Sequence, residues 1–259
     1  MNDDLRQKLA HDLKHSGFYS EMLAIRTCIA RRWECHGSFT YFDKDEQTSR
    51  ECDFEAVRRV TLAGAEGAVE VVARLLGQVK KSERPWIVFK DEHPRGDEDA
   101  EGLNDILHST TVPIAPRILA ELREGSLLAQ NGWRASGIHE GFKKPGDNSA
   151  WYGAFVTACK AAESVHERAR NALKPDTGIH LHFIKPVVVV DALVVTAELD
   201  GNEELLLTEI DKAAFTFEYQ SHAYARSWYQ LDVVTLAGLP EYLDVRARQL
   251  KRMAAVLEK

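Results

Sequence analysis

Residues 51–80 of the chain read ECDFEAVRRVTLAGAEGAVEVVARLLGQVK, and this stretch predicts a β-hairpin. Its two arms, 51–62 and 69–80, are rich in Val, Leu, Phe and Cys, as is typical of strands. Between them the segment Gly-Ala-Glu-Gly can turn tightly, because glycine tolerates a positive φ. Folding the chain about the middle of this turn sets Asp53 opposite Gln78.

In this register one face of the hairpin is mostly apolar and the other carries complementary charges, as a paired ladder requires. The charged face also sets Glu51 opposite Lys80. A shift of one residue would mix the two faces, so the side-chain pattern itself favours the register. The hairpin is therefore expected to bring Asp53, Gln78 and Lys80 together on one face of a sheet.

Such a set suits metal-dependent cleavage of phosphodiesters. Oxygen ligands hold a hard divalent cation such as Mg²⁺. The cation polarises the scissile phosphate and lowers the pKa of a bound water, while a lysine orients that water or neutralises developing charge. A structural interpretation stands beside this one: Asp53 and Gln78 as a solvated cross-strand pair, and Glu51 with Lys80 as an exposed ion pair contributing at most about 1 kcal/mol. Each residue alone favours that interpretation, and the set together favours a site.

Three segments carry a resemblance to a known family: SRECDFEA at 49–56, GQVKKS at 77–82 and RPWIVF at 84–89. They are similar to the motifs of the PD-(D/E)XK nuclease superfamily, which has the restriction-endonuclease-like fold. Many members read Glu-x-Lys before a Pro-Trp strand. Here Gln78 stands where that acid usually stands, a variant that looks like the Mrr-like restriction enzymes.

The family also carries a glutamate on its first helix, directed at the metal. A helix opening at residues 16–17 carries an apolar stripe at helical spacing, made of Phe18, Met22, Ile25 and Ile29. Glu21 lies beside this stripe and is expected to reach the rim of the sheet. The resemblance implies that Glu21, Asp53 and Gln78 are metal ligands, with the carbonyl of Val79 as a fourth, and that Lys80 is the catalytic lysine. The implied cofactor is Mg²⁺ or Mn²⁺.

The expected fold class is α/β, with a restriction-endonuclease-like αβββαβ core and a mixed central sheet flanked by helices. One domain spans 1–259: a core of 16–90 and 147–192, an insertion of about 91–146 with one helix near 116–128, and a C-terminal extension of about 193–259. Asn148-Ser149 is expected to cap the crossover helix. The valine run of 186–191 fits a strand buried on both faces.

The extension is expected to add strands and a terminal helix. A hairpin turn is predicted at 200–202, and Pro240 opens the helix. Leucines recur there every seven residues, at Leu243, Leu250 and Leu257. They suit docking on the body, which we favour, or a dimer contact.

A net charge of −7 argues against a generic nucleic-acid coat, so DNA binding would need local positive surface. The candidate nucleic-acid-binding residues are Lys81, Arg84, Lys143 and Lys144. DNA is the expected partner, with RNA left open. A second copy of the chain and a protein encoded in the same operon are the protein partners considered.

The N-terminus lacks the basic and apolar regions of a signal peptide, and no apolar run approaches membrane-spanning length, so a cytoplasmic protein without membrane contact is expected. Its four cysteines show no Cys-x-x-Cys pairing and are expected to be reduced core thiols. His180 and His182 alternate with Leu181 and would share one strand face; paired histidines can ligate metal, yet a half-exposed strand is favoured.

Three functions compete. The first is a Mg²⁺-dependent endonuclease acting on DNA, in restriction or defence against foreign DNA. The second is a catalytically inactive nuclease-like domain that serves as a nucleic-acid-binding or protein-assembly module. The third, hydrolysis by a nucleophile, is disfavoured because the chain has no Gly-x-Ser-x-Gly. Nucleotide binding through a phosphate loop is disfavoured as well, since no Gly-x-x-x-x-Gly-Lys motif exists.

Overall fold

The computed structural model describes residues 1–64, 67–91, 107–111, 118, 120–121, 124, 133–144, 147, 149–173 and 179–257. Its helices are α1 (Asp3–His15), α2 (Gly17–Ala30), α5 (Ala150–Ala172) and α6 (Leu239–Leu257). The first strands are β1 (Glu34–Asp43), β2 (Thr48–Gly64), β3 (Gly67–Lys81), β4 (Trp86–Asp91), β5 (Leu107–Thr110) and β6 (Arg134–Glu140). The later strands are β7 (Ile179–Asp191), β8 (Val194–Leu199), β9 (Leu205–Glu209), β10 (Lys212–Glu218) and β11 (Trp228–Thr235).

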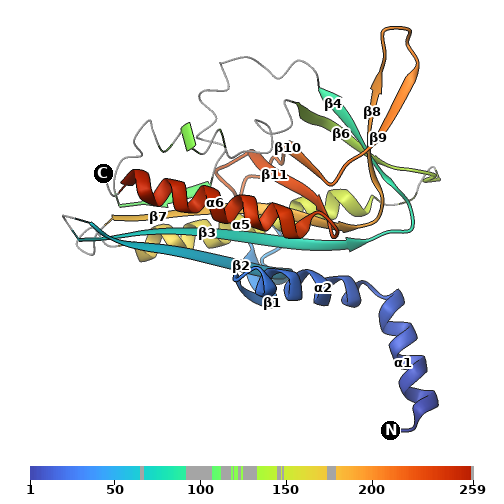
Figure 1. The fold of residues 1–259 in the computed structure, drawn as a ribbon, viewed down its shortest axis with the longest axis horizontal. Coiled ribbons are helices and arrows are strands. Elements are labelled where there is room, and N and C mark those ends of the chain that lie inside the picture. Colours follow the sequence, from blue (N-terminus) through green and yellow to red (C-terminus); the bar gives the residue numbers. More distant parts are fainter. Residues whose placement is uncertain are drawn as a thin grey trace.

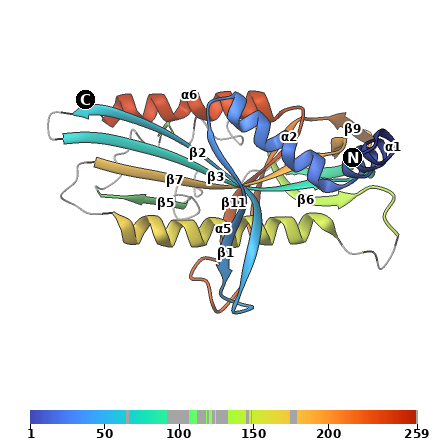
Figure 2. The same ribbon diagram turned by 90° about the horizontal axis from the view of Figure 1, so that it is seen from below.

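One mixed sheet runs through the molecule, in the order β1-β2-β3-β7-β11-β10-β6-β4-β8-β9, with β5 pairing β7 off this path. Figure 1 shows the sheet face-on, and in Figure 2 the helices α5 and α6 lie along opposite faces of it, with α2 on the face of α6. The expected α/β class with a mixed sheet flanked by helices is therefore confirmed.

Strands β2 and β3 form the predicted hairpin in the predicted register, from Gly64 opposite Gly67 to Phe54 opposite Gly77. The expectation that the ladder continues to Glu51 and Lys80 is wrong. Beyond Phe54, β2 pairs only with β1, where Cys52 faces Phe39, and this two-stranded arm turns away from the sheet (Figure 2). The end of the β2–β3 ladder is called the fork below.

Close packing marks the fork. The ring of Phe54 lies against Gly77, where a Cβ atom would come within 2.0 Å of the ring carbon Cζ. Only glycine leaves room for the ring. The backbone N–H of Val79, which has no β2 partner there, donates instead to the carboxylate of Asp53, so a side chain replaces a ladder bond.

Strand β7 lies parallel to β3 over its whole length, from Ile179 beside Val69 to Asp191 beside Lys81, and α5 is the crossover between them. The valine run Val187–Val190 is at most 1% exposed, as predicted for a strand covered on both faces. Val188 and Val190 pack in the cluster that contains α5, while the other two valines pack with α2 and α6.

Helix α6 docks on the body of the molecule. Its Leu243 and Leu250 are completely buried, against the sheet and against α2. Docking, the favoured interpretation of the seven-residue leucine spacing, is therefore confirmed for these two leucines. Likewise the apolar stripe of α5 is buried, including Ala154, Phe155, Ala158, Ala162 and Val165.

Helix α2 turns a different face to the sheet from the one its apolar stripe suggested. Phe18, Met22 and Ile29 are 65%, 63% and 57% exposed, whereas its buried residues are Ser20, Ala24 and Cys28. These small side chains let α2 approach the strands closely, which a large apolar face would prevent. Of the stripe residues, Ile25 packs against the core on this face, so the stripe as a whole is not the face that meets the sheet.

The segments expected as an insertion and an extension contribute strands to the same sheet. β5 pairs β7, β6 pairs β4 and β10, and β8–β11 complete the order. The hairpin predicted about 200–202 joins β8 and β9. Most of the helix expected near 116–128 lies outside the described residues.

All four cysteines are unpaired, and three of them are buried. Of the helices that the structure describes, none has both the length and the apolar character needed to cross a membrane.

Candidate active site at the fork of the sheet

The fork brings Asp53, Gln78 and Lys80 into direct contact. Gln78 Nε2 donates to Asp53 Oδ1 at 3.1 Å, and the Val79 N–H donates to Asp53 Oδ2 at 2.7 Å. Lys80 Nζ in turn donates to Gln78 Oε1 at 3.2 Å. The carboxylate, amide and ammonium groups therefore form one chain of hydrogen bonds, although Asp53 and Gln78 are not a ladder pair.

Glu21 reaches the same group of charges from α2. Burial raises the pKa of its carboxyl, the negative charge of Asp53 raises it further, and Lys80 opposes the shift. The hydroxyl of its neighbour Ser20 donates to the carboxylate of Asp191 at the end of β7, which fastens this turn of α2 to the sheet. Glu21 thus lies within electrostatic range of Asp53 and Lys80.

The carboxyl group of Asp53 is also partly shielded from solvent. Burial raises the pKa of its carboxyl, although the Val79 N–H and the charge of Lys80 act in the opposite direction. Two neighbouring carboxylates whose charged forms are both disfavoured are stabilised by a bound cation. Gln78, a residue that is 4% exposed, adds an amide oxygen, and oxygen donors of these kinds are the ones that Mg²⁺ or Mn²⁺ takes. For Val79 the structure places the N–H, rather than the carbonyl, against Asp53.

Three of the four basic residues expected to bind nucleic acid gather around Asp147. Arg84 pairs with its carboxylate at 2.8 Å, the backbone N–H of Lys144 donates to it at 3.2 Å, and the charge of Lys143 helps to lower the pKa of this carboxyl. The fourth, Lys81, instead donates to the Lys14 carbonyl in α1.

A pocket of about 540 Å³ opens beside the fork. Gln78 lines it from β3, and Glu51 lines it from the β1–β2 arm. The other lining residues come from the β1–β2 arm, α5 and the segment after β10; they are Tyr41, Asp43, Glu46, Arg50, Tyr152, Gly153, Val156, Thr157, Lys160 and Tyr219.

Lys160 is a pocket residue that the sequence analysis did not single out. Its Nζ lies 2.9 Å from both carboxylate oxygens of Asp43 and 2.8 Å from Asp45. Burial alone would lower the pKa of Lys160, but the hydrogen bonds to Asp45 and Asp43 raise it, so the ammonium stays charged. The sequence does carry a signal for this pair: a lysine within an alanine-rich helix, and three carboxylates within residues 43–46.

The aromatic segment after residue 213 divides between two uses. Phe215, Phe217 and Tyr229 are buried in the packing of the sheet. Tyr219 lines the pocket, and its hydroxyl donates to Asp45 at 2.5 Å. Tyr152 of α5, 49% exposed, lines it too.

The fork thus brings the Asp53 carboxylate, the Gln78 amide and the Lys80 ammonium group into one hydrogen-bonded chain beside an open pocket. Comparison of the chain with models of protein families, with curated proteins and with solved structures gives no match.

Proposed function

We propose that this chain is a Mg²⁺- or Mn²⁺-dependent endonuclease of the PD-(D/E)XK type that cleaves phosphodiester bonds in DNA, in restriction or defence against foreign DNA. The observation that carries the proposal is the hydrogen-bonded chain of Asp53, Gln78 and Lys80 at the fork, with the Glu21 carboxylate in electrostatic range. The order α2, β1, β2, β3, α5 and parallel β7, with β4, β5 and β6 inserted between β3 and α5, supports a restriction-endonuclease-like core.

The residues take distinct roles in this proposal. Glu21, Asp53 and Gln78 Oε1 hold the cation, which when bound supplies the Lewis acidity that polarises the scissile phosphate. The Val79 N–H and Gln78 Nε2 fix the Asp53 carboxylate before substrate arrives. Lys80 keeps a positive charge at Nζ, where it stabilises negative charge that develops on the phosphate.

Nucleic acid fits the surroundings of the fork. Because the whole chain carries −7, phosphate contacts must come from local basic groups, and Arg84, Lys143 and Lys144 gather near the start of α5. Tyr152 and Tyr219 give the pocket aromatic faces against which a base can stack.

The test is cleavage of single-stranded DNA, double-stranded DNA and RNA with Mg²⁺, Mn²⁺ or chelator present. Asp53→Asn and Lys80→Met are expected to lose metal-dependent cleavage, while Asp12→Asn and Lys251→Met, exposed changes on α1 and α6, retain it. Full-rate cleavage by both fork variants would refute the nuclease, and preference for RNA would replace DNA as the substrate.

A second candidate is a nuclease-like module without catalysis that binds nucleic acid or assembles with a partner protein. Its support is that both carboxylate oxygens of Asp53 already accept hydrogen bonds from the protein, and that Gln78 replaces an acid. It predicts no calorimetric Mg²⁺ or Mn²⁺ signal, and binding that survives Asp53→Asn. A metal signal that Asp53→Asn abolishes would reject it.

A further inference from the structure

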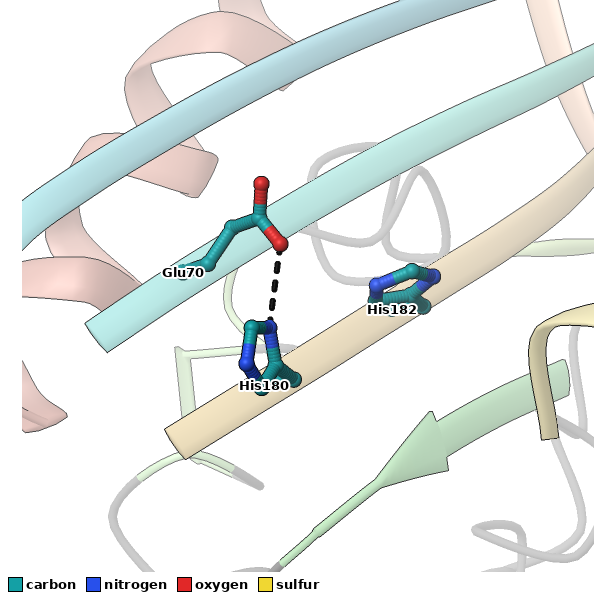
Figure 3. Close-up of side chains that lie close together, drawn as sticks. All are labelled: Glu70, His180 and His182. Atoms are coloured by element: carbon teal, nitrogen blue, oxygen red, sulfur yellow. Dashed lines mark hydrogen bonds and ion pairs between the residues drawn. The ribbon is translucent and has the colours of Figure 1, made fainter. Parts of the chain in front are cut away.

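A second group of donor side chains lies towards the other end of β3, where β3 pairs with β7 (Figure 3). Glu70 of β3 is the ladder neighbour of His180 in β7, and Val72 is the neighbour of His182. Because strand side chains alternate between faces, both imidazoles project to one side with the glutamate. The ligand atoms of Glu70, His180 and His182 all lie within 4.8 Å of one another.

This cluster is separate from the fork. Glu70 and Gln78 lie eight residues apart on β3, which at about 3.3 Å per residue corresponds to roughly 26 Å. Two ions that act on one phosphate lie about 3.5–4 Å apart. The cluster therefore cannot supply a second ion to a centre at Asp53.

Glu70 and His180 contact each other, whereas His182 differs from them. Glu70 Oε2 lies 3.0 Å from His180 Nδ1, and the two side chains are 27% and 19% exposed. His182 Nδ1 is buried and has no hydrogen-bond partner among the described residues. Buried polar atoms rarely lack a partner, so this nitrogen points to a ligand.

We propose that Glu70, His180 and His182 bind a divalent transition-metal ion of the Zn²⁺ class. Two imidazoles and one carboxylate are borderline donors that suit Zn²⁺, Co²⁺ or Ni²⁺, whereas Mg²⁺ takes oxygen ligands. Three protein ligands leave a coordination position open, which a closed four-ligand structural site does not. The ion joins β3 to β7 and presents its open position on the sheet face that carries the three side chains.

The surroundings favour a preformed site of moderate affinity. A metal ion binds the neutral imidazole. Burial and the charge of Arg74 lower the pKa of His182, while Glu70 acts in the opposite direction. The backbone N–H of His180 donates to Thr111 Oγ1 at 2.9 Å, and the backbone N–H of Thr111 donates to the His180 carbonyl at 3.1 Å. These two bonds fix the backbone at His180. The charge of Arg74 opposes a cation, although this arginine is paired with Glu55 at 2.7 Å.

Calorimetric titration of the chelator-treated full chain with Zn²⁺, and Co²⁺ absorption, test the proposal. One ion per chain is expected at micromolar concentration, with Co²⁺ bands of a nitrogen- and oxygen-ligated ion. His182→Gln and Glu70→Gln are each expected to weaken binding at least tenfold, whereas His139→Gln, an exposed histidine of β6, leaves it unchanged. Circular dichroism shows which variants are folded. Two ligand variants are compared so that a single misfolded variant does not decide the test.

Repeating the Zn²⁺ titration with the Asp53→Asn variant tests whether the ion binds at the fork instead. Retention of the ion in that variant supports the cluster, and its loss assigns the ion to the fork and overturns the proposal. Absence of stoichiometric binding, or undiminished binding in folded His182→Gln and Glu70→Gln, also overturns it.

Discussion

The fork and the Glu70–His180–His182 cluster stand near opposite ends of β3, and they arise in different ways. The cluster needs only an unbroken parallel ladder, because Glu70 and His180 are direct neighbours in it. The fork needs a ladder that stops, since Asp53 reaches the Val79 N–H only where β2 no longer pairs with β3. The comparison shows that register alone assembles one donor set, whereas a break in register creates the other.

The electrostatics of the two places also run in opposite directions. At the fork, burial raises the pKa values of Glu21 and Asp53. At the cluster, burial lowers the pKa of His182. The fork offers carboxylate and amide oxygens, whereas the cluster offers two imidazoles and one carboxylate. Hard cations are therefore expected at the fork and borderline ones at the cluster.

The largest expected effect separates the two sites by activity. Lys80→Met is expected to reduce metal-dependent DNA cleavage by about 100-fold or more, the loss typical of one removed transition-state donor. Zn²⁺ binding by the same variant is expected to equal that of the wild type. Initial cleavage rates and a Zn²⁺ titration check this, and a Lys80→Met protein that cleaves normally would remove the fork from the chemistry.

The next effect tests whether close packing makes the fork. Gly77→Val places side-chain atoms where the ring of Phe54 lies, and is expected to destabilise the protein by about 1–3 kcal/mol, as overpacked cores do. Gly153→Ala in α5 is the matched control, because a Cβ there meets no atom within 4 Å. Urea unfolding measures both, and equal stability of the two variants contradicts a tightly packed fork.

Gln78→Glu sharpens the contrast in ligand charge. The change adds a carboxylate beside Asp53 and removes the Nε2 donor, so the metal-free protein should lose stability. Mg²⁺ affinity should rise by about tenfold, equivalent to about 1.4 kcal/mol. Calorimetry checks the affinity, with the exposed Gln7→Glu as the control. Unchanged affinity would mean that position 78 contributes no ligand.

The smallest effect is a pH dependence without metal. Raised folded-state pKa values mean that Glu21 and Asp53 stabilise the fold most when protonated, below their unfolded-state pKa values, and that this contribution is lost as pH rises through the folded-state values. The Glu21→Gln/Asp53→Asn double variant should therefore lose less stability than the wild type between acidic and neutral pH. Urea unfolding in chelator at a series of pH values measures the difference, and a steeper loss in the double variant would reverse the sign.

The sequence predicts best what depends on alternation along a strand. The hairpin register and the buried valine run of β7 follow from side-chain pattern, and both were confirmed. The end of the ladder at Phe54 was not predictable, because it depends on a ring packed against Gly77 and on β1 pairing with the outer half of β2.

The missed features of the helices have a similar origin. Helical spacing in α2 identified the large apolar side chains but not which face meets the strands, and close approach selected Ser20, Ala24 and Cys28. Lys160 was overlooked because its partners, Asp43 and Asp45, are more than a hundred residues away in the chain.

The ion pair between Lys160 and Asp43 affects the entropy cost of ligand binding in the pocket. An ordered lysine side chain loses about 1.5–2 kcal/mol of rotamer entropy, and here folding has already imposed that loss. This ion pair joins α5 to the β1–β2 arm, so two walls of the pocket are held together before any ligand binds. A ligand that binds in the pocket would therefore pay little additional entropy for ordering Lys160 and Asp43.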